Sequence, residues 1–137
     1  MKKMALLTVP LALVFALAVM GCGKTPGTST STSTSAPANT IQMDATNFTA
    51  KAITVTANTP VHFDDTVAGG GYHIVCVADG TAYSATCLTS GDAPAELLGQ
   101  GTTFQGGETK DITFTKPGTY NVVCTVHPGM QIIVTVQ

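Results

Sequence analysis

The sequence of 137 residues is poor in charge and in aromatic side chains, and it contains no tryptophan. Only 10% of the residues are charged and 6% are aromatic. The formal net charge is −2, so the chain has no excess of basic residues with which to bind nucleic acid. The shortage of charge also argues against disorder of the whole chain. Heptad runs are absent, which excludes a coiled coil.

Motifs of hydrolytic enzymes are missing as well. There is no HExxH or GxSxG pattern, and no pair of carboxylates has a convincing partner. Asp64-Asp65 follows an expected strand, and we interpret it as a solvated turn.

The first 21 residues resemble the signal peptide of a bacterial lipoprotein. Lys2 and Lys3 precede a largely apolar stretch over residues 4–20, which is shorter than the ~20 residues that span a bilayer. The stretch leads into Val19-Met20-Gly21-Cys22, in which Cys22 would be the lipid acceptor. An uncleaved membrane helix and plain secretion are the alternatives. All three leave the rest of the chain outside the cytoplasm.

Residues 22–40 are predicted to be a lipidated Cys followed by a flexible tether. Ser, Thr, Pro and Gly dominate, and no apolar side chain after Cys22 is large enough to form a core. We therefore expect a lipid-anchored protein of the cell envelope, facing the periplasm or the outer surface. The lipid on Cys22 would hold it to a membrane.

From residue 41 to the C-terminus the pattern is that of short strands and turns. Alternating or β-branched segments occur at residues 53–56, 61–63, 72–77, 112–115, 120–126 and 132–136. Apart from the long interval between residues 77 and 112, they start roughly 8–12 residues apart, which is typical of a β-sandwich or barrel. Residues 93–98 are the only stretch that favours a helical turn.

Three residues near the C-terminus carry metal chemistry: Cys124, His127 and Met130. Strand parity places Cys124 on the core face, together with Val122, at the end of its strand. His127 and Met130 follow in a tight turn. A thiolate, an imidazole and a thioether in one loop favour copper, and a second imidazole would complete a blue-copper site.

Two histidines are left to supply that imidazole. In Val61-His62-Phe63 the apolar neighbours claim the core face, so His62 should face solvent. His73 begins a strand and shares a face with Val75, so we choose His73 as the ligand.

These features together resemble the cupredoxins of the plastocyanin and amicyanin type. The Cys-x2-His-x2-Met spacing is similar to the short ligand loop of amicyanins, and Lys116 to Tyr120 resembles the start of the preceding strand. The resemblance covers residues 41–137 and implies an all-β, Greek-key β-sandwich holding one type 1 copper. It also implies that His73, Cys124 and His127 form the trigonal ligand set, with Met130 as the axial ligand.

One position departs from the family. An Asn usually follows the first ligand His and helps to tie the two ligand loops together, whereas this chain has Ile74. Thr125 could instead hydrogen-bond across the two loops.

Two cysteines remain once Cys22 and Cys124 are assigned. Cys76 and Cys87 are an even pair in an oxidising compartment, so we expect a disulfide, with two unpaired thiols as the alternative. Cys76 has the opposite parity to His73. The bridge should therefore fold residues 78–90 over the outer face of that strand.

These expectations favour a protein that carries single electrons between redox proteins. Its partners, such as a cytochrome or a membrane electron-transfer complex, would dock transiently near His127. A copper module for storage, delivery or resistance is the alternative. An enzyme is not expected, because a second copper site would need more histidines than His62. We expect a monomer.

Overall fold

The structure is a computed structural model that describes residues 36–67 and 69–137. The expected signal peptide (1–21), the lipidation site Cys22 and most of the expected tether lie outside the described residues. Within the described part, no helix combines the length and hydropathy needed to cross a bilayer.

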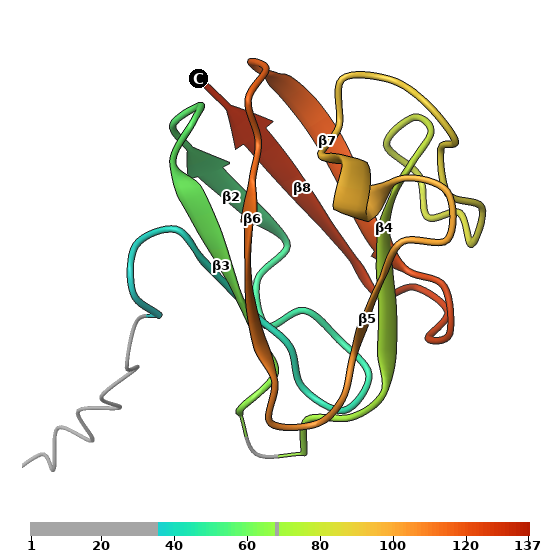
Figure 1. The fold of residues 1–137 in the computed structure, drawn as a ribbon. Coiled ribbons are helices and arrows are strands. Elements are labelled where there is room, and N and C mark those ends of the chain that lie inside the picture. Colours follow the sequence, from blue (N-terminus) through green and yellow to red (C-terminus); the bar gives the residue numbers. More distant parts are fainter. Residues whose placement is uncertain (1–35, 68) are drawn as a thin grey trace, which may run out of the picture. The chain divides into compact units, whose positions relative to one another are not determined.

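Strands dominate the described residues and form two sheets (Figure 1). One sheet has the order β1-β3-β6 and the other the order β2-β8-β7-β4-β5. Two pairings, β1 with β3 and β2 with β8, are parallel, and the others are antiparallel. The strands are β1 (Thr40–Gln42), β2 (Ala52–Val55), β3 (Pro60–Asp64), β4 (His73–Ala78), β5 (Thr102–Phe104), β6 (Thr109–Thr113), β7 (Gly118–Cys124) and β8 (Gln131–Val136).

The strands form because apolar side chains alternate along them and meet between the two sheets. In β8, Ile132, Val134 and Val136 are buried while their neighbours are partly exposed. They share one core with residues of the other sheet, including Val61 and Phe63 of β3. The predicted all-β sandwich is confirmed.

Two strands have no counterpart among the predicted segments, namely β1 and the edge strand β5. The β5 residues Thr102–Phe104 are too few to show an alternating pattern, and pairing with β4 defines them as a strand. The predicted helical turn is confirmed as a one-turn 3-10 helix, η1, at Ala95–Leu97.

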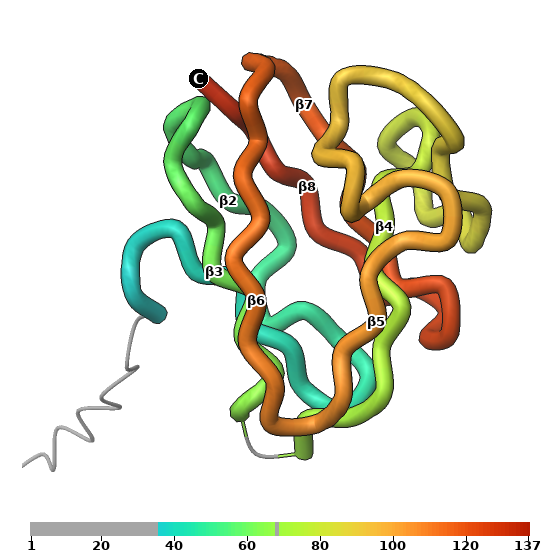
Figure 2. The backbone as a smooth tube through the Cα atoms, viewed as in Figure 1, coloured from blue at the N-terminus to red at the C-terminus, as the bar shows by residue number. Residues whose placement is uncertain are grey.

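The long connection from β4 to β5 is fixed to the outer face of its sheet by a disulfide. Cys76 and Cys87 are bonded, with their Cα atoms 5.6 Å apart, so the predicted pairing is confirmed. Figure 2 shows the first part of this connection on the side of β4 away from β3. Cys76 packs there with Ala78, Val123 and Tyr83. By loop-closure reasoning such a bridge contributes roughly 2–3 kcal/mol.

The register between β4 and β7 brings two distant parts of the sequence together. Val75 pairs with Cys124, the last residue of β7. His73, two residues before Val75, therefore lies just beyond the end of β7, where the loop to β8 begins. At this end of the sandwich the β7–β8 loop therefore lies beside the start of β4 (Figure 1).

Candidate metal centre

The β7–β8 loop is a tight turn closed by main-chain hydrogen bonds. The amide of Cys124 donates to the carbonyl of Met130 at 3.0 Å, and the amide of Met130 donates to the carbonyl of His127 at 3.1 Å. Gly129 adopts φ +83°, a conformation that favours glycine. The turn therefore holds Cys124, His127 and Met130 on a short, closed stretch of backbone.

The β4 end of the site is tied to this turn through the main chain. The amide of Thr125 donates to the carbonyl of Ile74 at 2.9 Å. Residue 74 thus connects the two ligand loops through its backbone, although it lacks the Asn side chain usual in the resembled family. The cross-loop bond expected of Thr125 is present and involves its amide.

Three donor atoms from these two loops converge. The Sγ atom of Cys124 lies 3.7 Å from Nδ1 of His73 and 3.6 Å from Nδ1 of His127, and the two Nδ1 atoms are 3.2 Å apart. Cys124 is a free, buried thiol, and His73 is also fully buried. His127 is half-buried. In the described residues these three form the one cluster of His, Cys, Asp and Glu suited to a metal.

The separations fit a single small metal ion. Bonds of ~2.0 Å to nitrogen and ~2.3 Å to sulfur, at trigonal angles, place donor atoms ~3.5–3.7 Å apart. The observed separations of 3.2, 3.6 and 3.7 Å lie close to these values. A thiolate with two imidazoles is also a donor set that suits copper.

Met130 lies at the same end of the sandwich and is fully buried. It belongs to the core cluster that contains Cys124, and its main chain bonds to both Cys124 and His127. Its place at the close of the ligand turn is the one that the sequence predicts for an axial thioether.

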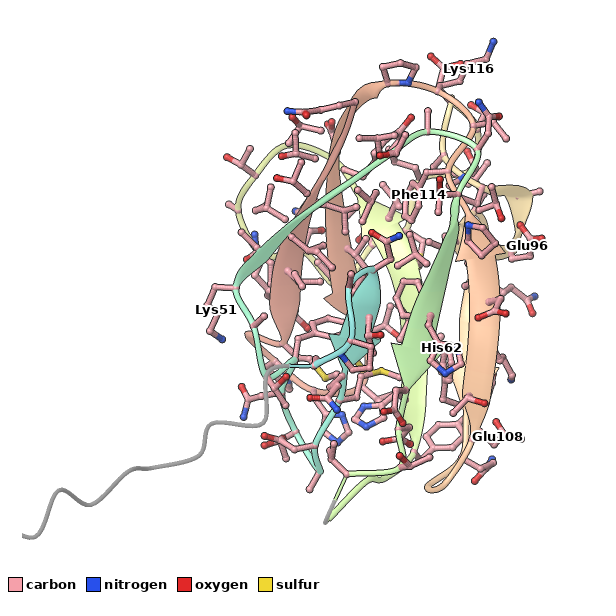
Figure 3. The ribbon with its side chains drawn as sticks, turned by 90° about the vertical axis from the view of Figure 1, so that its left-hand side faces the viewer. Lys51, His62, Glu96, Glu108, Phe114 and Lys116 are labelled. Carbon is pink, nitrogen blue, oxygen red and sulfur yellow. A yellow bond between two sulfur atoms is a disulfide. The ribbon has the colours of Figure 1, made fainter. Side chains whose placement is uncertain are left out.

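His62 takes no part in the cluster. Its side chain is 46% exposed on β3, and its Nδ1 atom lies 2.6 Å from a carboxylate oxygen of Asp111 on β6. Figure 3 shows it on this strand, away from the interior. The parity argument that chose His73 over His62 agrees with these positions.

Comparison with known proteins identifies the family. A model of copper-binding proteins of the plastocyanin/azurin family matches residues 35–137. The chain belongs to this family.

Solved structures agree with the fold of a cupredoxin of the plastocyanin and amicyanin type. Amicyanin from Paracoccus versutus is 21% identical, with 74% of this chain and 83% of that chain covered and a TM-score of 0.50. A reduced Cu(I) form of an amicyanin variant has the same identity and coverage, with a TM-score of 0.53. Among curated protein sequences no relative matches.

One region of a copper enzyme also has a structure similar to that of this chain. The Cu-containing nitrite reductase from Thermus scotoductus is 28% identical over 72% of this chain, with a TM-score of 0.50. This cupredoxin spans only 22% of the length of that reductase. The cupredoxin family and the converged donors fit a single type 1 copper site.

A buried carboxylate beside the ligands of this cupredoxin corrects one sequence interpretation. Asp65 is not part of a solvated turn but is fully buried, with Oδ1 3.5 Å from Nε2 of His73. The signal was present in the sequence, because Asp65 has the same parity as the buried Val61 and Phe63, and extending the alternation by two residues places it on the core face. Burial raises the pKa of Asp65, and burial lowers the pKa of His73 while Asp65 opposes that shift.

The cupredoxin site is also supported from the opposite face of its sheet. The hydroxyl of Tyr83 donates to the carbonyl of Cys124 at 3.2 Å. The side-chain amide of Asn121 donates to the carbonyl of Ala82 at 2.8 Å. Burial, and secondarily Cys124, raises the pKa of Tyr83. The disulfide-bonded connection is thus anchored to β7 next to the ligand, a contact without a local sequence signal.

Proposed function

We propose that this cupredoxin is a membrane-tethered type 1 copper protein that carries single electrons between extracytoplasmic redox partners. The observation that carries the proposal is the convergence of His73, Cys124 and His127 at one end of a rigid β-sandwich. Family membership over residues 35–137 supports it. One amicyanin structure that shares the fold is a reduced Cu(I) form.

In this proposal four side chains hold the ion. Nδ1 of His73, Sγ of Cys124 and Nδ1 of His127 would bind copper, with the thioether of Met130 as a fourth, weaker ligand. Copper supplies the one-electron chemistry by changing between Cu(I) and Cu(II). The protein keeps the donors in nearly the same places in both states, since strand pairing and the closed turn restrict them.

His127 is the proposed point of electron entry and exit. It is the half-buried member of the cluster, and the side chains of Val126 and Tyr72 are exposed by 40% and 47%. Small apolar contact areas suit brief redox encounters, which lie at the low end of interface size. Without Lys2 and Lys3, four basic residues remain against eight acidic ones, so weak steering toward a basic partner is expected.

The location of the protein is part of the same proposal. Residues 1–21 would be removed as a signal peptide, Cys22 would carry the lipid, and residues 23–40 would link it to the cupredoxin domain at 41–137. β1 begins at Thr40, at the edge of this expected tether. Mass spectrometry of the exported protein, and its retention in the membrane fraction, would test the anchor. A Cys22→Ser variant that is released from membranes is the expected result.

A carrier is favoured over an enzyme because the described residues offer one cluster of metal donors. The remaining imidazole, His62, is exposed and pairs with Asp111. The match to the nitrite reductase covers 22% of that enzyme. We therefore assign no substrate to the chain.

The decisive experiment is the visible spectrum and voltammetry of the copper-loaded exported protein. An intense thiolate-to-copper band and a reversible one-electron couple are expected. Cys124→Ser should abolish both, because a hydroxyl is a much poorer copper donor than a thiolate. Copper binding without the intense band, with Cu(I) affinity that depends on Met130, would instead indicate storage or delivery.

A further inference from the structure

The carboxylate of Asp65 has no assigned role, although its position is unusual. It is fully buried and directly follows β3. Oδ1 accepts a hydrogen bond from the amide of Gly71 at 3.3 Å and lies 3.5 Å from Nε2 of His73, while Oδ2 has no partner. A buried carboxylate is costly unless it is paired, so a neutral side chain would serve packing better.

The backbone on both sides holds this carboxylate in place. The amide of Asp65 donates to the carbonyl of Glu108, and the amide of Gly107 donates to the carbonyl of Asp65, each at 2.9 Å. The β3–β4 loop passes directly over it. A Cβ atom on Gly70 would lie 2.3 Å from the main-chain oxygen of Asp65 and 2.8 Å from Oδ1. Because Gly70 has no side chain, the β3–β4 loop can pack closely against Asp65. This packing holds Asp65 beside His73.

The two ring nitrogens of His73 face different groups. Its Nδ1 faces Cys124 and His127, and its Nε2 faces the Asp65 carboxylate. The main chain of Asp44 is the other acceptor near this ring, and in this structure Nε2 makes no full hydrogen bond. An imidazole that binds a metal through Nδ1 must carry its proton on Nε2. A carboxylate facing Nε2 accepts that proton in a hydrogen bond and raises the basicity of the ligand.

We propose that Asp65 is a positioning residue for copper: its carboxylate accepts the Nε2–H of His73, directs Nδ1 toward Cys124 and His127, and favours Cu(II) over Cu(I). This inference rests on the proposed function for its copper readout. It goes beyond that function by assigning to Asp65 a part in setting the reduction potential.

The first test uses the metal-free protein and is independent of copper. Nitrogen-15 NMR of the imidazoles, at a pH where His73 is neutral, should place its proton on Nε2. A proton on Nδ1, with Nε2 unprotonated, would overturn the proposal. This result would stand even if the protein proved not to be a blue copper protein.

The second test compares Asp65→Asn with Asp64→Asn in the copper-loaded protein. Asn keeps the shape of Asp and an acceptor for Gly71, but removes the carboxylate. Asp64 is the matched control, since its carboxylate serves Thr66 rather than a ligand. Asp65→Asn should lower Cu(II) affinity about 10–100-fold. If Cu(I) affinity falls tenfold less, the potential rises by ~59 mV.

The outcomes separate the possible roles of Asp65. A raised potential in Asp65→Asn, with a much smaller change in Asp64→Asn, supports the proposal. Equal potentials in the two variants would overturn it and leave the Asp44 main chain as the partner of His73. A wild-type protein without a type 1 spectrum would refute the proposed function, while the NMR result would still decide the hydrogen bond.

Discussion

The two loops that form the metal centre are built in different ways. In the β7–β8 loop, the two main-chain hydrogen bonds that close the turn join Cys124 to Met130 and Met130 to His127, and one further bond joins Thr125 to Ile74 of β4. In the β3–β4 loop, Asp65 is held by Glu108 and Gly107 of the β5–β6 turn. The first loop is determined mainly by its own sequence, whereas the second depends on a distant turn.

The loops also differ in their access to solvent. His127, from the β7–β8 loop, is half-buried, with exposed Val126 beside it. His73, the first residue of β4 after the β3–β4 loop, has no exposed surface and lies against a buried carboxylate. In the proposed function, the first loop would exchange electrons with a partner, and the second would set the properties of the bound copper. Substitutions made in one loop and compared with substitutions in the other test this division of roles between the two loops.

The largest difference is expected when each histidine is replaced by glycine. His127→Gly should lose the blue spectrum and regain a coloured site when free imidazole is added, because the gap opens to solvent. His73→Gly should lose the spectrum without recovery, and its free energy of unfolding should fall by ~2–5 kcal/mol because a buried ring is deleted. Absorption during an imidazole titration, on variants shown by circular dichroism to be folded, measures this. Equal recovery of both would contradict the division.

A smaller effect is expected from glycine substitutions in the β3–β4 loop. Gly70→Ala should lower the free energy of unfolding by ~1–3 kcal/mol, since the new methyl group would overlap the main-chain oxygen of Asp65. Gly71→Ala is the matched control, because a Cβ there meets its nearest atom at 3.4 Å. Its change should stay within ~0.5 kcal/mol. Thermal or urea unfolding measures both, and similar losses would show that the approach over Asp65 is not the constraint.

The difference between the loops also explains what could be predicted from the sequence. Spacing and parity placed Cys124, His127 and Met130 at the end of a buried strand, and parity favoured His73 over His62. These are local properties of strands and turns. The burial of Asp65 also follows the parity of Val61 and Phe63, and it was missed because two adjacent carboxylates were taken for a solvated turn. The contact of Tyr83 with Cys124 and the strand β5, in contrast, arise from pairing with distant segments. No pattern within a few residues encodes them.

The β7–β8 loop offers a more subtle test at Met130. Met130→Gln should keep the intense colour, because axial ligation tunes the site without building it. A harder oxygen donor favours Cu(II), so the potential should fall, by ~59 mV for each tenfold gain in relative Cu(II) affinity. Met130→Leu keeps an apolar side chain without a donor and should shift the potential upward. Voltammetry that gave unchanged potentials in both variants would remove Met130 from the ligand set.

The smallest effect is expected at His62, the histidine outside both loops. Its ring is exposed on β3 and pairs with Asp111 of β6 across the smaller sheet. Exposed pairs of this kind contribute ~0.2–1 kcal/mol, so His62→Ala should lower the free energy of unfolding by no more than that. The spectrum and the potential of the copper-loaded protein should not change, since no donor atom is lost. Asp111→Ala should give the same small loss, and the double variant should add little to either, because both remove one interaction. A change of colour or potential in His62→Ala would mean that the third imidazole contributes to the site, and the division of the centre between two loops would then be incomplete.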